Sequence, residues 1–184
     1  MNITVYLGAY EGNDPKFKRA VTDFGSWIGN QRHTLIYGGS KSGLMGLLAT
    51  SALAAGGKVI GVEPRFFIDA ELQLDTLTQL IVTETMAERK AKMIELGDAF
   101  VAFPGGTGTL EEITEVMSQV SLKQSDAPCI LYDLNGYYEG LRTLLARMID
   151  EGLSSLARQS GIYFARDLAE IKALLNRPGA ETIR

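Results

Sequence analysis

Residues 104–112 read PGGTGTLEE and combine groups that bind an anion with two adjacent carboxylates. Three glycines leave backbone amides open, two threonines add hydroxyl donors, and a helix from Thr109 directs its positive end at the same point. A phosphate group is the natural ligand of such a turn. An ordinary tight turn, with Thr109 as the helix N-cap, is the structural alternative.

The helical period separates the two carboxylates of this stretch, Glu111 and Glu112. The apolar stripe of the helix that follows consists of Ile113, Val116, Met117 and Val120. At about 100° per residue, Glu111 lies roughly opposite this stripe and Glu112 lies about 90° from its centre. Glu111 is therefore expected in solvent, where it interacts favourably with the helix dipole. Glu112 is expected beside the anion-binding turn and is the better candidate for chemistry.

A second predicted helix, within TETMAERKAKMIEL (83–96), carries adjacent cations. Its apolar stripe consists of Met86, Met93 and Ile94. The helical period puts Lys90 near the middle of that stripe and Arg89 about 100° from it. A lysine on a core face is uncommon unless it snorkels to solvent or binds an anion. An exposed helix with a snorkelling lysine is one interpretation, and recognition of an anionic substrate by the Arg–Lys pair is the other.

Short β-rich runs alternate with helical patterns along the chain. Strands are predicted at 3–8, 33–39, 58–62, 79–84, 99–103 and 129–133, with a shorter one at 161–165. Helices are predicted at 15–31, 43–56, 85–97, 109–124, 137–151 and 167–176. Strands with little polar alternation, each followed by a helix, indicate an α/β fold with a mostly parallel sheet covered on both faces. The prediction is a single doubly wound, Rossmann-like domain over residues 1–184.

Three of the strand-to-helix turns are rich in glycine and should meet at the carboxyl edge of the sheet. They read LGAYEGNDP (7–15), YGGSKSGLMG (37–46) and FPGGTGTLEE (103–112). Three such turns on one edge favour a ligand that lies close to the backbone. The first turn lacks G-x-G-x-x-G, the second strand lacks the acidic residue that binds an adenosine ribose, and there is no Walker motif. NAD and P-loop nucleotides are therefore disfavoured, and no cofactor is predicted.

The amino-acid composition limits the classes of binding partner and the cellular compartment that are expected for this chain. The 184 residues carry a net charge of −4 without a Lys/Arg tract, which argues against nucleic acid or an anionic membrane as the main partner. The single cysteine, Cys129, suits a reducing cytoplasm, and with one histidine, His33, leaves almost no ligands for a zinc site. The N-terminus lacks signal-peptide features, and the Ala/Leu run near 44–55 is too short to span a bilayer. A cytoplasmic protein without a metal is expected.

Three of these segments together resemble the LONELY GUY (LOG) family. PGGTGTLEE (104–112), MAERKAKM (86–93) and YGGSKSGLMG (37–46) resemble its signatures P-G-G-x-G-T-x-x-E, M-x-x-R-K and G-G-x-x-x-G-L-M-G. The likeness covers nearly the whole chain. It implies a Rossmann-like phosphoribohydrolase that cleaves cytokinin riboside 5′-monophosphates, and often AMP, to the free base and ribose 5-phosphate. Many relatives carry the label lysine decarboxylase, for which the residues offer no independent support.

The resemblance, carried over by position, implies the site residues. It makes Arg89 and Glu112 the catalytic pair. It places on the substrate Glu71, Lys90, Gly39, Gly105, Gly106, Thr107, Gly108, Thr109 and Ser118. Ala87 stands where the family usually has histidine, and MSQVS (117–121) replaces a Trp-rich stretch. These departures surround the expected base pocket, so hydrolysis is expected while the preferred base stays open.

The residues leave two alternative functions open, and the resemblance adds a prediction about the oligomeric state. A nucleotide-binding module could keep the phosphate-binding turn and hydrolyse little, although a pure binder has no obvious need for the Glu112 carboxylate. A pyridoxal phosphate-dependent decarboxylase is a distant third, because an anion-binding turn alone does not identify that cofactor. The resemblance also implies a homodimer. The apolar helix within GLMGLLATSALAAGG (43–57) suits the interface, with neighbouring helices of the same domain as the alternative cover.

Overall fold

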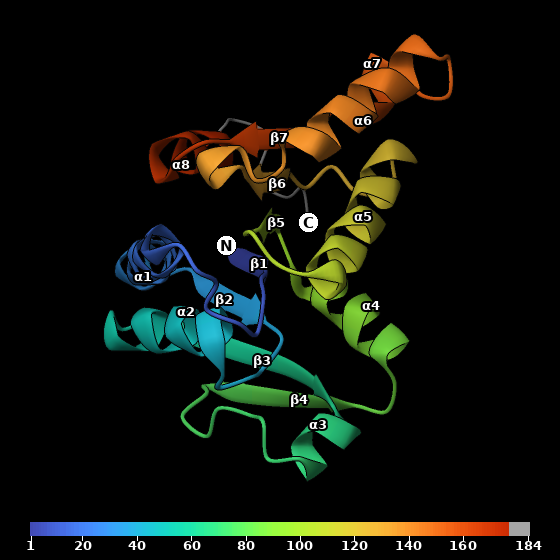
Figure 1. The fold of residues 1–184 in the computed structure, drawn as a ribbon. Coiled ribbons are helices and arrows are strands. Elements are labelled where there is room, and N and C mark those ends of the chain that lie inside the picture. Colours follow the sequence, from blue (N-terminus) through green and yellow to red (C-terminus); the bar gives the residue numbers. More distant parts are fainter. Residues whose placement is uncertain (177–184) are drawn as a thin grey trace.

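The computed structural model describes residues 1–176, and a seven-stranded sheet forms its centre (Figure 1). The strands are β1 (Asn2–Tyr6), β2 (Thr34–Tyr37), β3 (Lys58–Pro64), β4 (Gln79–Thr83), β5 (Ala99–Ala102), β6 (Cys129–Tyr132) and β7 (Ile162–Ala165). Neighbouring strands are parallel throughout, in the order β4-β3-β2-β1-β5-β6-β7. The predicted doubly wound α/β fold is confirmed, and each predicted strand is found.

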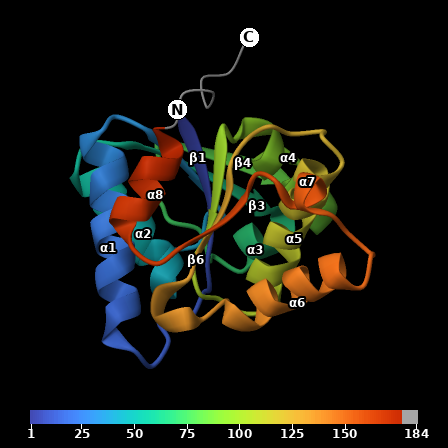
Figure 2. The ribbon, with the colours of Figure 1, turned by 90° about the horizontal axis from the view of Figure 1, so that it is seen from above.

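Helices cover both faces of the sheet. They are α1 (Pro15–Asn30), α2 (Gly43–Ala54), α3 (Arg65–Asp69), α4 (Met86–Leu96), α5 (Thr107–Ser121), α6 (Glu139–Asp150), α7 (Leu156–Gln159) and α8 (Leu168–Leu175), with a 3-10 turn η1 at Leu134–Gly136. Helices α1, α2 and α8 lie on one face and α4, α5 and α6 on the other (Figures 1 and 2). The predicted helices are all present. The short α3 and α7 were not predicted, because one helical turn is too short to show a period.

The central strands are buried on both faces, which explains why their sequences do not alternate. In β1, Ile3 and Val5 belong to the core under α1 and α2, whereas Tyr6 belongs to the core under α4 and α5. The one polar residue within this stretch, Thr4, donates a hydrogen bond from Oγ1 to the carbonyl oxygen of Met93 at 2.9 Å. The buried hydroxyl is thereby satisfied.

Helix α2 packs against α1. A Cβ atom at Gly25 would lie 2.6 Å from the carbonyl oxygen of Leu48, so the two helices are in close backbone contact. Leu48 is fully buried. Helix α1 covers one side of α2, while Met45, Leu47 and Leu53 stay partly exposed, so a subunit interface on this helix stays a prediction.

The chain order creates a crevice at the middle of the sheet. From β1 the chain winds outward through β2, β3 and β4, then returns to β5 on the other side of β1. Ligands of doubly wound folds bind where the strand order reverses in this way. Within residues 1–176, no helix is long and apolar enough to cross a bilayer. The single domain over 1–184 stays a prediction, since 177–184 lie outside the described residues.

Candidate active site

A cavity of about 310 Å³ lies at the carboxyl ends of β1 and β5, at this point of reversal. Five segments contribute to its wall: the end of β1 with the turn after it, the turn after β2, α2, α4, and the first turns of α5. Its lining includes Tyr6, Gly8, Gly38, Arg89, Gly106, Thr107, Gly108, Thr109 and Glu112. The glycine-rich turns after β1, β2 and β5 therefore meet at one site, as the sequence predicts.

A buried ion pair forms the wall of this cavity. Arg89 Nη1 of α4 donates to Glu112 Oε1 of α5 at 2.6 Å. Arg89 is 6% exposed and Glu112 is 9% exposed. The guanidinium also donates from Nε to the carbonyl oxygen of Val62 at 3.0 Å. Removing either member would leave an uncompensated buried charge, so the two side chains act as one unit.

Burial and the ion pair act on Glu112 in opposite directions. Burial raises the pKa of the Glu112 carboxyl, and the Arg89 guanidinium opposes this shift. Tyr6 lies next to them, and its hydroxyl is buried without a hydrogen-bond partner among the described residues. Burial raises the pKa of Tyr6, with a further contribution from the Glu112 charge. The Tyr6 hydroxyl therefore stays neutral at physiological pH.

The structure separates the two glutamates as the helical period predicts. The Glu111 side chain is 63% exposed, whereas that of Glu112 is 11% exposed. Glu111 pairs with Lys90 Nζ at 2.8 Å on the outside of α4 and α5. The prediction of one solvated and one core-edge carboxylate is confirmed.

The predicted phase of α4 is wrong. Arg89 and Met93 are the buried residues of this helix, and Lys90 lies on the adjoining surface. Lys90 Nζ contacts Glu111 at 2.8 Å and Glu115 at 3.0 Å, and Lys90 is not part of the cavity lining. The apolar stripe misled the assignment, because the interior accepts a cation where Glu112 and a backbone carbonyl are available to bind it.

The turn predicted to bind a phosphate, from Gly105 to Thr109, has open space beside two of its glycines. Gly106 is the N-cap of α5, so the helix begins at Thr107 and the predicted start at Thr109 is two residues late. Thr109 is buried inside the first turn. A Cβ atom at Gly106 or Gly108 would meet nothing within 4 Å, whereas one at Gly105 would collide with the Thr109 side chain. The first backbone N–H groups of a helix have no intrahelical partner and point out of its N-terminus.

Two tyrosines from the segment after β6 hold this turn. Tyr137 donates from its hydroxyl to the carbonyl oxygen of Gly105 at 2.6 Å. Tyr138 donates in the same way to the carbonyl oxygen of Phe103 at 2.6 Å. Both contacts use carbonyl groups and leave the amide groups of the turn free. Sequence reasoning missed these residues, although two adjacent tyrosines after a strand at the same sheet edge were a usable signal.

Three more residues assigned to the substrate, Gly39, Glu71 and Gly105, lie off the cavity wall. Gly38, rather than Gly39, lines the cavity, and a Cβ atom on Gly38 would collide with the Arg89 guanidinium. Gly39 adopts a φ of +88° and faces Glu63. Glu71 is exposed in the turn after α3, with a φ of 56°, and does not contribute to the lining.

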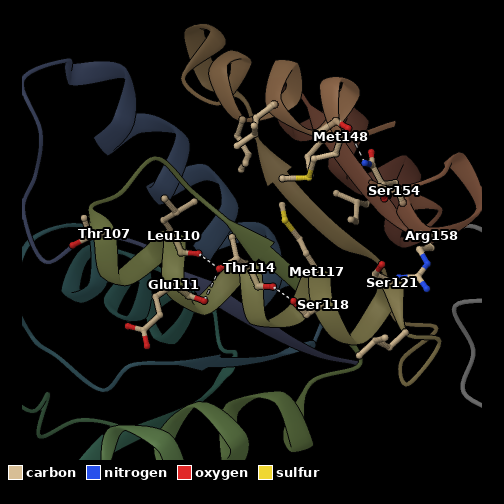
Figure 3. Close-up of a pocket in the computed structure, with 16 residues that line it drawn as sticks. Thr107, Leu110, Glu111, Thr114, Met117, Ser118, Ser121, Met148, Ser154 and Arg158 are labelled. Atoms are coloured by element: carbon tan, nitrogen blue, oxygen red, sulfur yellow. Dashed lines mark hydrogen bonds between the residues drawn. The ribbon is translucent and has the colours of Figure 1, made fainter. Parts of the chain in front are cut away.

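Ser118 also lies elsewhere, in a groove on the outer side of α5 (Figure 3). This groove has a volume of about 750 Å³ and is lined by residues of α5, α6 and α7. Ser118 Oγ donates to the carbonyl oxygen of Thr114 at 3.0 Å, one turn back along α5. Within one chain, Ser118 therefore does not join the cavity that holds Arg89 and Glu112.

Comparison with known proteins identifies the family. Residues 45–175 match a family model described as "Possible lysine decarboxylase". The chain is 38% identical over 178 residues to the cytokinin riboside 5′-monophosphate phosphoribohydrolase of Rhodococcoides fascians, covering 96% of this chain and 90% of that one. It is also 38% identical over 150 residues to the Arabidopsis thaliana phosphoribohydrolase LOG5, covering 82% and 66% of the two chains. The chain belongs to the LOG family.

Several solved structures share the fold of this LOG-family chain. The structure titled TM1055 covers 95% of this chain and 98% of its own, with a TM-score of 0.71 at 22% identity. The molybdenum cofactor carrier protein of Chlamydomonas reinhardtii covers 96% and 98%, with a TM-score of 0.67 at 22% identity. At these identities the likeness shows the fold alone.

Carboxylates line the cavity, at Glu111 and Glu112, but they do not form part of a larger cluster of metal-ligating side chains within the described residues. Among the described residues, no group of three or more His, Cys, Asp or Glu side chains could hold a metal ion. Cys129 is buried in the core, and burial raises the pKa of its thiol. Arg89, Glu112 and the backbone of the open α5 turn are among the polar groups that line the cavity.

Proposed function

We propose that this protein hydrolyses the N-glycosidic bond of a purine or cytokinin nucleoside 5′-monophosphate, including AMP, to the free base and ribose 5-phosphate. The observation that carries the proposal is the buried Arg89–Glu112 pair in the same cavity as the open N-terminus of α5. The LOG-family relatives are named phosphoribohydrolases of such monophosphates, which supports the same activity. No cofactor enters the proposed reaction.

In the reaction, the bond between C1′ of the ribose and the base nitrogen breaks, and a water oxygen bonds to C1′. The base leaves with a proton, and positive charge develops on the ribose ring, as in glycosidase transition states. Glu112 is the carboxylate placed to stabilise that charge or to attack C1′. Arg89 is not the proton donor, because a guanidinium does not deprotonate in proteins. Its role is to orient Glu112.

The substrate phosphate is assigned to the turn from Gly105 to Thr109. The open space at Gly106 and Gly108 admits an anion against the backbone, and the α5 dipole favours its negative charge. Binding the phosphate holds the remote end of the nucleotide and makes attack at the ribose effectively intramolecular. Lys90 lies at the outer side of the same helices, where Glu111 and Glu115 neutralise its charge, and its contact with the substrate is a proposal from the family resemblance alone.

The second candidate is a nucleotide-binding module of the same fold with little hydrolysis. The buried Glu112 carboxylate disfavours it, because a pure binder of an anionic nucleotide has no obvious need for a negative charge in the same cavity. Incubation of the purified protein with a panel of nucleoside 5′-monophosphates separates the two. Release of free base and ribose 5-phosphate supports the hydrolase, and release from no member of the panel would favour the binding module.

We also propose that the protein is a cytoplasmic homodimer that pairs through the groove between α5 and α6. Exposed leucines gather on this side of the molecule, at Leu110, Leu122, Leu144, Leu153 and Leu156. Large exposed apolar surface is rare on soluble monomers, and a second copy would bury it. Ser118 lies in the same groove, so pairing there would bring it toward the partner's surface and give it access to a substrate. Glu71 lies in the exposed turn after α3, and its contact with the substrate stays part of the proposal.

A further inference from the structure

Glu63 is a buried carboxyl group that the proposed reaction does not use. It lies at the carboxyl end of β3 and is 1% exposed. Its Oε2 atom has no hydrogen-bond partner among the described residues. The nearby Tyr37 hydroxyl does not supply one, because it donates to the carbonyl oxygens of Gly39 at 2.8 Å and Ser40 at 3.2 Å. An ionised carboxylate without a donor is costly at such a position.

Glu63 and Arg89 share the two-glycine turn after β2. A Cβ atom on Gly39 would lie 2.9 Å from Glu63 Oε2, so this carboxylate packs directly against Gly39. The Arg89 guanidinium packs against the preceding glycine, Gly38, and its Nε donates to Val62, the residue before Glu63. Its Nη1 is used by Glu112, while Nη2 donates no hydrogen bond to a described residue. The guanidinium thus forms an ion pair with Glu112, interacts electrostatically with Glu63 without a direct ion pair to it, and has a free arm.

Few other charges reach Glu63. Tyr37 from β2 and Arg89 from α4 interact with it electrostatically. The sequences of α2 and β4, GLMGLLATSALA and QLIVT, contain no ionisable residue. Arg65 of α3 is exposed and lies 3.5 Å from Glu84. Burial raises the pKa of Glu63 to about 7, with Arg89 opposing, so both protonation states are populated at physiological pH.

We propose that Glu63 is a positioning residue that acts through Arg89 and thereby sets the pH range of the Arg89–Glu112 pair. In its neutral form Glu63 leaves the guanidinium to Glu112. In its ionised form Glu63 attracts the free arm of Arg89 and so competes with Glu112 for the guanidinium. Ionisation also changes the net charge of the three groups from 0 to −1, and the added negative charge opposes binding of an anionic substrate. The catalytic consequence rests on the proposed function, whereas the coupling of Glu63 to Arg89 does not.

The coupling is tested without substrate by following the Arg89 Nε–H signal by NMR as a function of pH. The signal is identified by its absence in Arg89→Lys. The wild type should show a chemical-shift change with a midpoint near pH 7, and Glu63→Gln should lose it. Glu95→Gln, a surface change on the same helix as Arg89, should keep the wild-type curve. A wild-type signal that does not change between about pH 6 and 8 overturns the proposal, even if Glu63→Gln fails to fold.

The kinetic consequence is tested by the pH profile of AMP cleavage. In the wild type, kcat/KM should fall about tenfold per pH unit above the midpoint, since one deprotonation inactivates the site. In Glu63→Gln this alkaline limb should move to higher pH, with Glu95→Gln unchanged. An identical limb in wild type and Glu63→Gln overturns the proposed positioning role. Absence of base release at every pH would instead remove the proposed hydrolase function, and the NMR titration would still decide the coupling.

Discussion

At the scale of single residues, the two adjacent glutamates give the sharpest test of the site. Glu112→Ala should lower turnover by about two to four orders of magnitude while nucleotide binding survives, because the carboxylate acts in the transition state. Glu111→Ala should be almost silent, since its side chain is 63% exposed and Lys90 keeps Glu115 as a partner. Steady-state kinetics and calorimetric binding measure both effects. Equal losses from the two variants would contradict the assignment.

Glu63 gives a second residue-scale prediction, on stability. Burial raises its pKa from 4.5 to about 7, so the folded chain holds a proton that the unfolded chain releases. This contribution is fully present below pH 4.5 and is lost as the pH rises through about 7. Since one pKa unit corresponds to about 1.4 kcal/mol, the loss over this range is on the order of 3–4 kcal/mol.

Urea unfolding at a mildly acidic and a mildly alkaline pH measures this loss. The free energy of unfolding should fall with rising pH in the wild type and fall much less in Glu63→Gln. Glu112, whose pKa burial also raises, contributes in the same direction and is common to both proteins. Equal pH dependence in the two proteins would show that Glu63 is not buried in its neutral form.

At the scale of elements, the N-terminus of α5 predicts that stability and activity can be separated. Gly108→Ala replaces a helical glycine in open space, so it should stabilise the fold by about 0.5–1 kcal/mol. The added methyl group stands where the phosphate is proposed to approach, so the KM for AMP should rise and kcat should fall. Gly140→Ala is the matched control, since Gly140 occupies the same position of α6, also in open space and away from the cavity. It should bring the same stabilisation with unchanged kinetics. A Gly108→Ala enzyme with normal kinetics would contradict the phosphate assignment.

The same element predicts how the enzyme responds to the substrate's phosphate. Adenosine should be cleaved far more slowly than AMP, with part of the loss in kcat, because phosphate binding at α5 helps to position the reacting bond. Comparing kcat and KM for the two substrates measures this. Comparable efficiencies would mean that the α5 turn does not hold the phosphate.

At the scale of the whole molecule, the proposed dimer predicts which leucine controls assembly. Leu144→Asp, at a half-exposed position of α6 in the groove, should dissociate a folded dimer and reduce activity. Val82→Asp, at an exposed position of the edge strand β4, is the control and should leave assembly unchanged. Leu48→Asp should instead unfold the chain, because Leu48 is fully buried. Light scattering during size-exclusion chromatography reports the mass. A wild-type mass near 20.0 kDa that is stable to dilution would contradict the dimer.

The sequence pattern was sufficient for the strands, the longer helices and one proposed catalytic residue. The strands around β1 and β5 were predictable because a parallel sheet buried on both faces leaves continuous apolar runs. Glu112 was predictable because the apolar stripe of α5 is regular and places it at the core edge. Arg89 and Lys90 were not separable in the same way, because an apolar stripe does not show that the interior holds a carboxylate able to bind a cation.

By itself, the sequence determined the doubly wound fold, the glycine-rich sheet edge and the family, since all three are local patterns or direct likeness. Only the tertiary structure decided that Gly38 rather than Gly39 meets Arg89, that Tyr137 and Tyr138 hold the glycine-rich turn before α5, and that Ser118 faces away from the cavity. Nothing in the sequence pattern of β3 indicated a chemical role for Glu63. Its position near Arg89 depends on how β2, β3 and α4 pack. Contacts between segments that are distant in the chain produce no periodic pattern in the amino-acid sequence.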